Sequence, residues 1–383
     1  MALFKKEKVE EIENTEEITL EEELKIEALE VEKAEVLPLN KENYGPFYEY
    51  VIADDVTDID YNGHELWITY TNNKREKIEE HGVTDSFIKA FSQRVANKVS
   101  KPFNKQNNLL EAETETLRIS ILHESAAPSG RSLCLRKTPI KVRMSCKSIL
   151  KDNYMPKEIM CLLANCVKAH MNFNIVGEPG AGKTELAKFI SQFIPAKERA
   201  ITIEDSPEWH YRAINPGKDC VEMRVNEGFS YAKAIKTCLR QNPSWIMLSE
   251  ARSVEAKFLI ESWSTGVNGI TTLHTDDIRK IPSRYLNMMA NRDDADRLEN
   301  DIYEFCNIAL LVRKKARPDG TAYRYVDQMG FLYKNKDGSK DIEMLVKNGE
   351  LINRTIPEEL KAKLDRAEVK DYFANAEVER KLE

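Results

Sequence analysis

The sequence predicts an α/β fold, with a mostly parallel β-sheet in its second half and a smaller α+β domain before it. Beyond residue 156, short apolar runs alternate with helical patterns. This alternation is typical of βαβ units whose strands are buried on both faces. Upstream, an alternating run at 65–70 follows a turn at 61–64, and a helical stretch covers 85–95. Such a mixture of short strands and a helix predicts a separate α+β domain.

Changes in composition along the chain predict five segments. Residues 5–36 contain 13 Glu and little aromatic content, so we expect a solvated, partly disordered tail rather than a docking helix. The basic run that ends at Pro156 predicts a linker, because proline suits the first turn of the helix expected at 156–170. The predicted segments are an acidic tail at 1–40, an α+β domain at 41–140, a linker at 141–155, an α/β domain at 156–315 and a C-terminal extension at 316–383, strand-like and then helical.

The composition predicts a soluble chain with a charged surface. Of its 383 residues, 42% are hydrophobic and 32% charged, and the net charge is −7. The longest apolar stretches are about five residues, against the roughly 18 that a bilayer requires, and the start does not resemble a secretory signal. Seven cysteines without CxxC spacing predict reduced thiols in a cytosolic protein rather than structural zinc. The net negative charge argues against bulk nucleic-acid binding but is compatible with a local basic channel.

A phosphate-binding loop is the clearest functional motif. Residues 177–184 fit the pattern G-x-x-x-x-G-K-[ST] between a strand-like run at 172–176 and a helical run at 185–192. The glycines let backbone N–H groups turn inward at a helix N-terminus, whose partial positive charge favours anions. Lys183 would reach the terminal phosphates, and the Thr184 hydroxyl would bind Mg²⁺. The predicted nucleotide-binding residues of this loop are Gly177, Glu178, Pro179, Gly180, Ala181, Gly182, Lys183 and Thr184.

Acidic residues end two later strand-like runs. Glu204 and Asp205 follow the first of them, and in an open parallel sheet ligands lie beyond the carboxyl ends of the strands. A carboxylate there could orient or deprotonate the attacking water, or it could cap the next helix. Glu250 ends the second run and could hold Mg²⁺ through water. Because Ser249 stands directly before it and no Asp closes the run, the pattern does not predict direct metal ligation by this strand.

His274 ends a fourth strand-like run, at 269–273. A lone histidine is more often satisfied by a structural partner than by a ligand. Its position beside three other polar strand ends favours a contact between an imidazole nitrogen and phosphate. We therefore expect His274 to sense the γ-phosphate.

Taken in order, these four strand ends resemble the motifs of the secretion-superfamily ATPases, the motors of type II and type IV secretion, conjugation and type IV pili. The Walker A motif is similar to 177–184, the aspartate box to 202–208, the Walker B region to 239–252 and the histidine box to 265–275. Two positions depart from the family pattern: Ser249 stands where Gly is usual, and Ser244 where Asp commonly follows the Pro. The resemblance implies a RecA-like P-loop ATPase domain at 156–315.

The resemblance also implies roles for the site residues. Glu204 would position the attacking water, and Glu250 would support Mg²⁺ or share the role of base. The stretch before the linker is similar to that of the conjugation branch, in which arginines of the N-terminal domain reach nucleotide phosphates. Arg118, Arg131 and Arg136 would then clamp the nucleotide, since a guanidinium fork matches phosphate oxygens. The alternative is that they are surface arginines on strand edges.

The predicted function is Mg²⁺-dependent hydrolysis of ATP by a hexameric motor that energises a type IV secretion, conjugation or related pilus-type machine. ATP and Mg²⁺ are the expected cofactors. The family implies a cytoplasmic homo-hexamer at the membrane face, partnered by inner-membrane components, with no membrane span and no nucleic acid as a direct ligand. Two alternatives stay open: a P-loop nucleic-acid motor of the helicase or recombinase kind, which would need a basic channel and stacking aromatics, and a nucleotide-gated scaffold without turnover.

Overall fold

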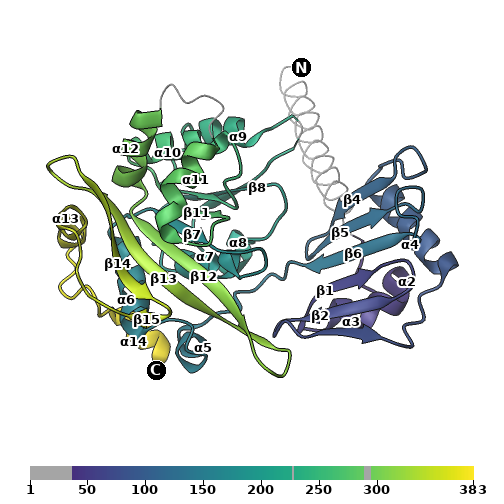
Figure 1. Ribbon diagram of the computed structural model, residues 1–383. Helices are drawn as coiled ribbons and strands as arrows, with labels where there is room; N and C mark the ends of the chain where they lie inside the picture. The colour runs from purple at the N-terminus through teal and green to yellow at the C-terminus, as the bar shows by residue number, and fades with distance from the viewer. Residues whose placement is uncertain (1–36, 227, 289–294) are drawn as a thin grey trace, which may run out of the picture. The chain divides into compact units, whose positions relative to one another are not determined.

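The computed structural model describes residues 37–226, 228–288 and 295–383 (Figure 1). The chain divides into two compact units, with the division between Thr138 and Pro139. Of the predicted acidic tail, residues 1–36 lie outside the described residues.

The N-terminal unit is an antiparallel sheet packed against helices, in line with the α+β domain that the sequence predicts. Its strands lie in the order β3-β2-β1-β6-β5-β4, and each neighbouring pair is antiparallel. The longest of the described helices in this unit, α4, begins after Thr84, whose hydroxyl accepts a hydrogen bond from the backbone N–H of Phe87. Its residues Ile88, Phe91 and Val95 have helical spacing and are buried in the core of this unit. The elements are α2 (Lys41–Tyr44), η1 (Gly45–Phe47), α3 (Tyr48–Ile52), β1 (Val56–Tyr61), β2 (Leu66–Tyr70), β3 (Arg75–Ile78), α4 (Asp85–Lys98), β4 (Leu109–Glu113), β5 (Leu117–Leu122) and β6 (Ser132–Lys137).

The second unit is built on a sheet in the order β15-β14-β13-β12-β7-β11-β10-β8-β9. The strands from β12 to β9 in this order are parallel, and β13, β14 and β15 continue the sheet antiparallel. The strands are β7 (Phe173–Val176), β8 (Ala200–Glu204), β9 (Cys220–Arg224), β10 (Trp245–Leu248), β11 (Asn268–Leu273), β12 (Ile308–Ala316), β13 (Ala322–Lys334), β14 (Lys340–Lys347) and β15 (Glu350–Leu351). The helices are α5 (Cys146–Lys151), α6 (Lys157–Lys168), α7 (Lys183–Ser191), α8 (Tyr211–Ile214), α9 (Tyr231–Cys238), α10 (Glu255–Ser264), η2 (Ile278–Lys280), α11 (Ile281–Asn287), α12 (Ala295–Phe305), α13 (Glu358–Arg366) and α14 (Ala376–Leu382).

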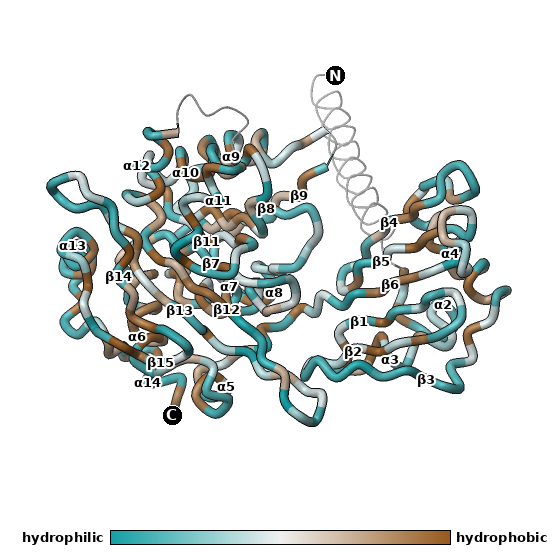
Figure 2. Tube along the Cα trace, in the orientation of Figure 1, coloured by the Kyte–Doolittle hydropathy of each residue, from teal (hydrophilic) through white to brown (hydrophobic). Residues whose placement is uncertain are grey.

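Helices cover both faces of this sheet, so its central strands are buried on both sides. Residues of α6, α7, α13 and α14 share one apolar core, and residues of α9, α10, α11 and α12 share a second. Successive strand residues alternate between them, as at Ile175 and Val176, because side chains along a strand point to opposite faces. Figure 2 shows apolar residues along the strands of this unit and hydrophilic residues at the hairpin tips. This arrangement confirms the predicted α/β fold with a mostly parallel sheet.

The strand order brings separate parts of the chain to one edge of the sheet. β7 lies between β12 and β11, although β8, β9 and β10 come before β11 in the sequence. Because β7, β8, β10 and β11 are parallel, their carboxyl ends lie at the same edge. Ligands of open α/β sheets bind beyond this edge, where the strand order reverses.

The predicted linker and C-terminal extension both contribute to the second unit. The segment 141–155 contains α5, which Ser145 caps by accepting a hydrogen bond from the backbone N–H of Ser148. Residue 315 lies within β12, so the sheet continues past the predicted boundary into β13, β14 and β15. These strands could not be recognised as part of the sheet, because a hairpin pattern gives no information about the strand beside it. Within the described part of the chain, no helix is both long and apolar enough to cross a membrane.

Candidate functional site

The phosphate-binding loop connects β7 to α7 and has a backbone that requires glycine. Gly177 has φ +147°, and a Cβ atom there would lie 2.3 Å from the carbonyl oxygen of Val312 on β12. Gly182 has φ +96° and directly precedes the first residue of α7. Both positions are closed to other residues by sterics, because L side chains rarely adopt a left-handed backbone. The loop therefore leads into the positive end of a helix, as the motif predicts.

Lys183 is the buried cation of this loop. The residue is 8% exposed, and its amine donates hydrogen bonds to the carbonyl oxygens of Gly177 at 2.9 Å and Glu178 at 3.2 Å. Burial lowers the pKa of Lys183 to about 8, and the negative charges of Glu250 and Glu208 oppose that shift. A phosphate at the loop would stabilise the ammonium form, because an anion near an amine raises its pKa.

His274 connects the lysine of the loop to a carboxylate on a neighbouring strand end. Its Nδ1 lies 3.3 Å from the amine of Lys183, and its Nε2 lies 3.1 Å from Oε1 of Glu250. Burial and the positive charge of Lys183 lower the pKa of His274. A neutral imidazole with its proton on Nε2 fits both contacts, since Nδ1 then accepts from the lysine and Nε2 donates to the glutamate.

Arg252 extends this chain of contacts to the aspartate box. One of its NH groups lies 3.0 Å from Oε2 of Glu250, and another lies 2.9 Å from Oδ2 of Asp205. The backbone N–H groups of Arg252 and Ser253 both donate to the carboxylate of Glu255, which fixes the turn that carries the arginine. Charged groups from the ends of β7, β8, β10 and β11 thus meet at one place.

Glu204 lies at the end of β8, but its carboxylate is held by its own turn. Its Oε1 accepts hydrogen bonds from the backbone N–H groups of Glu208 at 3.0 Å and Trp209 at 3.1 Å, and the residue is 6% exposed. Burial raises the pKa of Glu204 to about 8, against the lowering effect of these two hydrogen bonds. Glu208 reaches the phosphate loop instead, where its Oε2 accepts a hydrogen bond from the hydroxyl of Thr184 at 3.2 Å. The role of Glu204 in positioning water stays a prediction.

The raised pKa of Glu204 predicts an unusual pH dependence of stability. Since the folded state holds this proton up to about pH 8 and an exposed glutamate loses it near pH 4.5, the folded state binds more protons between these values. The free energy of unfolding should therefore fall with rising pH, by up to about 1.4 kcal/mol per pH unit from this one group. Glu204→Gln keeps the acceptor oxygen and removes the titration. In urea unfolding of the full chain, the free energy of unfolding of the variant should rise relative to that of the wild type as the pH rises from 5 to 8. A difference that does not change with pH would contradict the assignment of a buried, protonated carboxyl.

The three predicted arginine clamps all lie in the N-terminal unit. Arg118 on β5 and Arg136 on β6 are register partners, so they lie on the same face of that sheet. Arg136 donates to Asp58 at 2.7 Å. Arg131 pairs with Glu124 at 2.7 Å, and its guanidinium lies over the ring of Phe103 at 5.2 Å. Contact between these arginines and a nucleotide stays a prediction.

The family described as "Type II/IV secretion system protein" matches residues 86–336, about two thirds of the chain. The chain belongs to this family.

Individual members show how far the likeness extends. An uncharacterized protein of Bacillus anthracis is 30% identical over 271 residues, which are 70% of this chain and 61% of that protein. The type IV secretion system protein VirB11 of Bartonella quintana is 34% identical over 132 residues, 33% of this chain and 36% of VirB11. The match thus spans less than two thirds of the length of either relative. The structure of the pilus retraction motor PilT with bound ADP has a TM-score of 0.56 at 16% identity, covering 83% of this chain and 84% of that one. At this identity the likeness is one of fold, and it agrees with the predicted RecA-like architecture.

The second unit offers oxygen ligands that suit Mg²⁺ in this secretion-family site. Mg²⁺ prefers carboxylate and hydroxyl oxygens, keeps several waters and is usually shared with substrate phosphates. The Thr184 hydroxyl and the Glu208 carboxylate already lie together at the start of α7. Glu250 lies at the same edge, where His274 and Arg252 occupy its two oxygens.

Sequence reasoning assigned no role to Glu208 or Arg252, although both take part in this geometry. Glu208 was visible as the last acid of the aspartate box, four residues beyond Glu204. The signal that could have singled it out is the Ser206-Pro207 pair between them, which favours the start of a turn. Arg252 follows Glu250 by two residues, but its contact with Asp205 depends on the neighbouring positions of β8 and β10 in the sheet.

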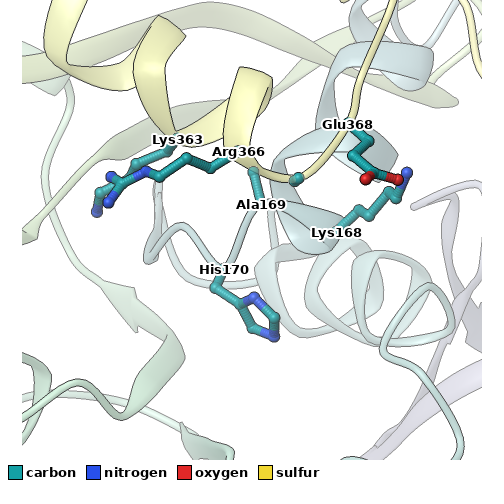
Figure 3. A pocket seen from close by; sticks show the side chains of 7 residues that line it. Lys168, Ala169, His170, Lys363, Arg366 and Glu368 are labelled. Atoms are coloured by element: carbon teal, nitrogen blue, oxygen red, sulfur yellow. The ribbon is translucent and has the colours of Figure 1, made fainter.

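A cavity of about 520 Å³ lies elsewhere, near the amino-terminal end of β7 (Figure 3). It is lined by Lys168, Ala169, His170, Lys363, Arg366, Ala367 and Glu368. Figure 3 shows Lys363 and Arg366 extending to one side, Lys168 and Glu368 to the other, and His170 away from both pairs. Because these groups diverge, they do not form a converging set of ligands, and we assign no function to this cavity.

Proposed function

We propose that the chain binds ATP with Mg²⁺ at the phosphate loop and hydrolyses it. The observation that carries this proposal is the continuous set of contacts from Lys183 through His274 and Glu250 to Arg252. Phosphoryl transfer requires positioning and stabilisation of negative charge more than covalent chemistry. A lysine, a histidine and a carboxylate brought to one helix N-terminus meet that requirement.

Each residue of the set has a distinct role in the proposed reaction. Lys183 exchanges its contacts with the Gly177 and Glu178 carbonyls for phosphate oxygens. Bound Mg²⁺ would neutralise part of the phosphate charge, and Thr184 would provide one of its oxygens. His274, neutral and linked to the lysine, is placed to respond to the γ-phosphate. Glu250 orients water for attack or supports the metal, while Arg252 fixes the direction of its carboxylate.

We further propose that hydrolysis energises a secretion or conjugation apparatus. VirB11, one of the relatives, is by name a type IV secretion system protein, and the fold is shared with a pilus retraction motor. In this proposal the chain works as a homo-hexamer on the cytoplasmic side of the membrane and contacts inner-membrane components of the machine. The arginines of the N-terminal unit would then complete the site as clamps on nucleotide phosphates.

Steady release of phosphate from ATP tests the proposed activity. The purified full chain should release phosphate continuously when ATP and Mg²⁺ are both present, and removal of the metal with EDTA should abolish the release. A nucleotide-gated scaffold would bind ATP without steady release, so binding without turnover would contradict the proposal.

A further inference from the structure

Arg324 lies against the phosphate loop although it belongs to none of the four motifs. It lies on β13, 140 residues beyond Thr184 in the sequence. Its Nε and one of its NH groups lie 3.4 and 3.3 Å from the carbonyl oxygen of Gly180, in the middle of the loop. A Cβ atom at Gly182 would lie 3.2 Å from its Cδ. The arginine therefore packs on the loop itself and not on a distant surface.

The hairpin of β12 and β13 holds Arg324 in this position. On β12, the carbonyl oxygen of Val312 is so close to Gly177 that no side chain fits there. On β13, Val326 is the register partner of Val312, and both are buried. Arg324 lies two residues from Val326 and therefore points to the same face of the sheet. Both strands of the hairpin thus line the loop, with β12 at its start and β13 at its middle.

A second arginine, Arg143, lies close to Arg324. It precedes α5, and its backbone N–H donates to Oε2 of Glu185 at 3.1 Å. Lys188 lies 3.3 Å from the other oxygen of the same carboxylate. Among the residues that the structure describes, the Nε of Arg143 is buried without a hydrogen-bond partner, and so is the hydroxyl of Tyr154. Burial lowers the pKa of Arg324, and the positive charge of Arg143 lowers it further.

These contacts bring two guanidinium groups near each other beside the loop. The positive charge of Arg143 acts against that of Arg324, while Glu185 attracts Arg324 and pairs with Lys188. An unpaired buried donor costs free energy, and two guanidinium groups near each other repel. An anion would relieve both costs, since planar guanidinium groups match phosphate oxygens in geometry and charge.

We propose that Arg324 and Arg143 form a second anion-binding element of the nucleotide site and bind a phosphate group of the nucleotide from the side of the β12–β13 hairpin. This inference rests on the proposed function, because it takes the loop to be a nucleotide site. It gives the C-terminal hairpin a direct part in nucleotide binding, so that the hairpin and the loop respond together to the bound phosphate.

Equilibrium binding of ADP and of inorganic pyrophosphate to the full chain tests the proposal. Arg324→Gln and Arg143→Gln should each raise the dissociation constants of both ligands about tenfold or more, as expected for loss of a charge-assisted hydrogen bond. Arg324→Lys, which keeps the charge, should recover part of the loss. The matched control is Arg317→Gln on the same hairpin, where an exposed guanidinium stacks on Tyr323 and the constants should not change.

Three outcomes separate this inference from the proposed function. If the wild type binds ADP and Lys183→Ala does not, while Arg324→Gln binds as tightly as the wild type, the second anion-binding element is wrong and the nucleotide site stands. If Arg324→Gln weakens ADP but leaves pyrophosphate unchanged, the arginine acts on the base or ribose, which also overturns the assignment. If the folded wild type binds neither ligand, the proposed function itself fails.

Discussion

Replacing Lys183 by alanine should lower the rate of ATP hydrolysis by about a hundredfold to a thousandfold. The amine of Lys183 is buried at the loop, where it donates to two backbone carbonyls and lies 3.3 Å from an imidazole nitrogen. It is thus the positive group best placed to stabilise charge on the transferred phosphoryl group. Steady-state phosphate release from wild type and variant at the same protein concentration measures the effect, together with the dissociation constant of ADP, which should also rise.

The control for this variant is Lys197→Ala, which removes an exposed lysine just beyond α7. It should hydrolyse ATP at the wild-type rate. Both variants should unfold at the same urea concentration as the wild type, within a small margin. For Lys183→Ala we expect this because burying the amine costs free energy, so its removal does not cause a large loss of stability. Equal phosphate release from Lys183→Ala and Lys197→Ala would contradict the assignment of the phosphate loop.

Glu250→Gln should lower turnover about a hundredfold or more and leave ADP binding within a few-fold of the wild type. The glutamine keeps the shape of the side chain but loses the charge that the metal or the attacking water requires. It would also weaken the contacts with His274 at 3.1 Å and Arg252 at 3.0 Å. A fall in kcat with a nearly unchanged dissociation constant of ADP distinguishes a role in chemistry from a role in binding the nucleotide.

Comparison with Glu204→Gln identifies the base. Glu204 is buried and hydrogen-bonded to two backbone N–H groups of its own turn, whereas Glu250 contacts the histidine that reaches Lys183. A loss of turnover in Glu250→Gln alone would assign the base to Glu250. If only Glu204→Gln loses turnover, Glu250 has the supporting role and the carboxylate of Glu204 must leave its turn to act. The exposed Glu261 of α10 offers a matched control, since Glu261→Gln should change neither constant.

Sequence reasoning reached the parts of the site that local patterns determine. The phosphate loop, with Lys183 and Thr184, could be predicted because its motif sets glycines at a fixed spacing before the start of a helix. The positions of Glu250 and His274 follow because each ends an apolar run, and parallel strands place such ends at one edge. The resemblance to secretion ATPases rested on the same runs in the same order, and the family match agrees with it.

The remaining contacts depend on structure that the sequence does not display locally. The direction of the Glu204 carboxylate is decided by backbone N–H groups in a turn, and these leave no trace in composition. Arg324 reaches Gly180 only because β13 pairs with β12, and β12 with β7. None of the four motifs includes a residue that the sheet order brings in from the C-terminal segment. For the same reason, the boundary predicted at residue 315 fell inside a strand.

A crystal structure of the full chain with ADP and Mg²⁺ tests the central claim most directly, namely that separate strand ends and the loop hold one nucleotide. We predict that the amine of Lys183 leaves the carbonyls of Gly177 and Glu178 and contacts the phosphates, with the metal beside the Thr184 hydroxyl and Glu250 at the same edge. A nucleotide bound away from this loop, or a loop that keeps the Lys183 contacts unchanged with ADP present at saturating concentration, would contradict the claim.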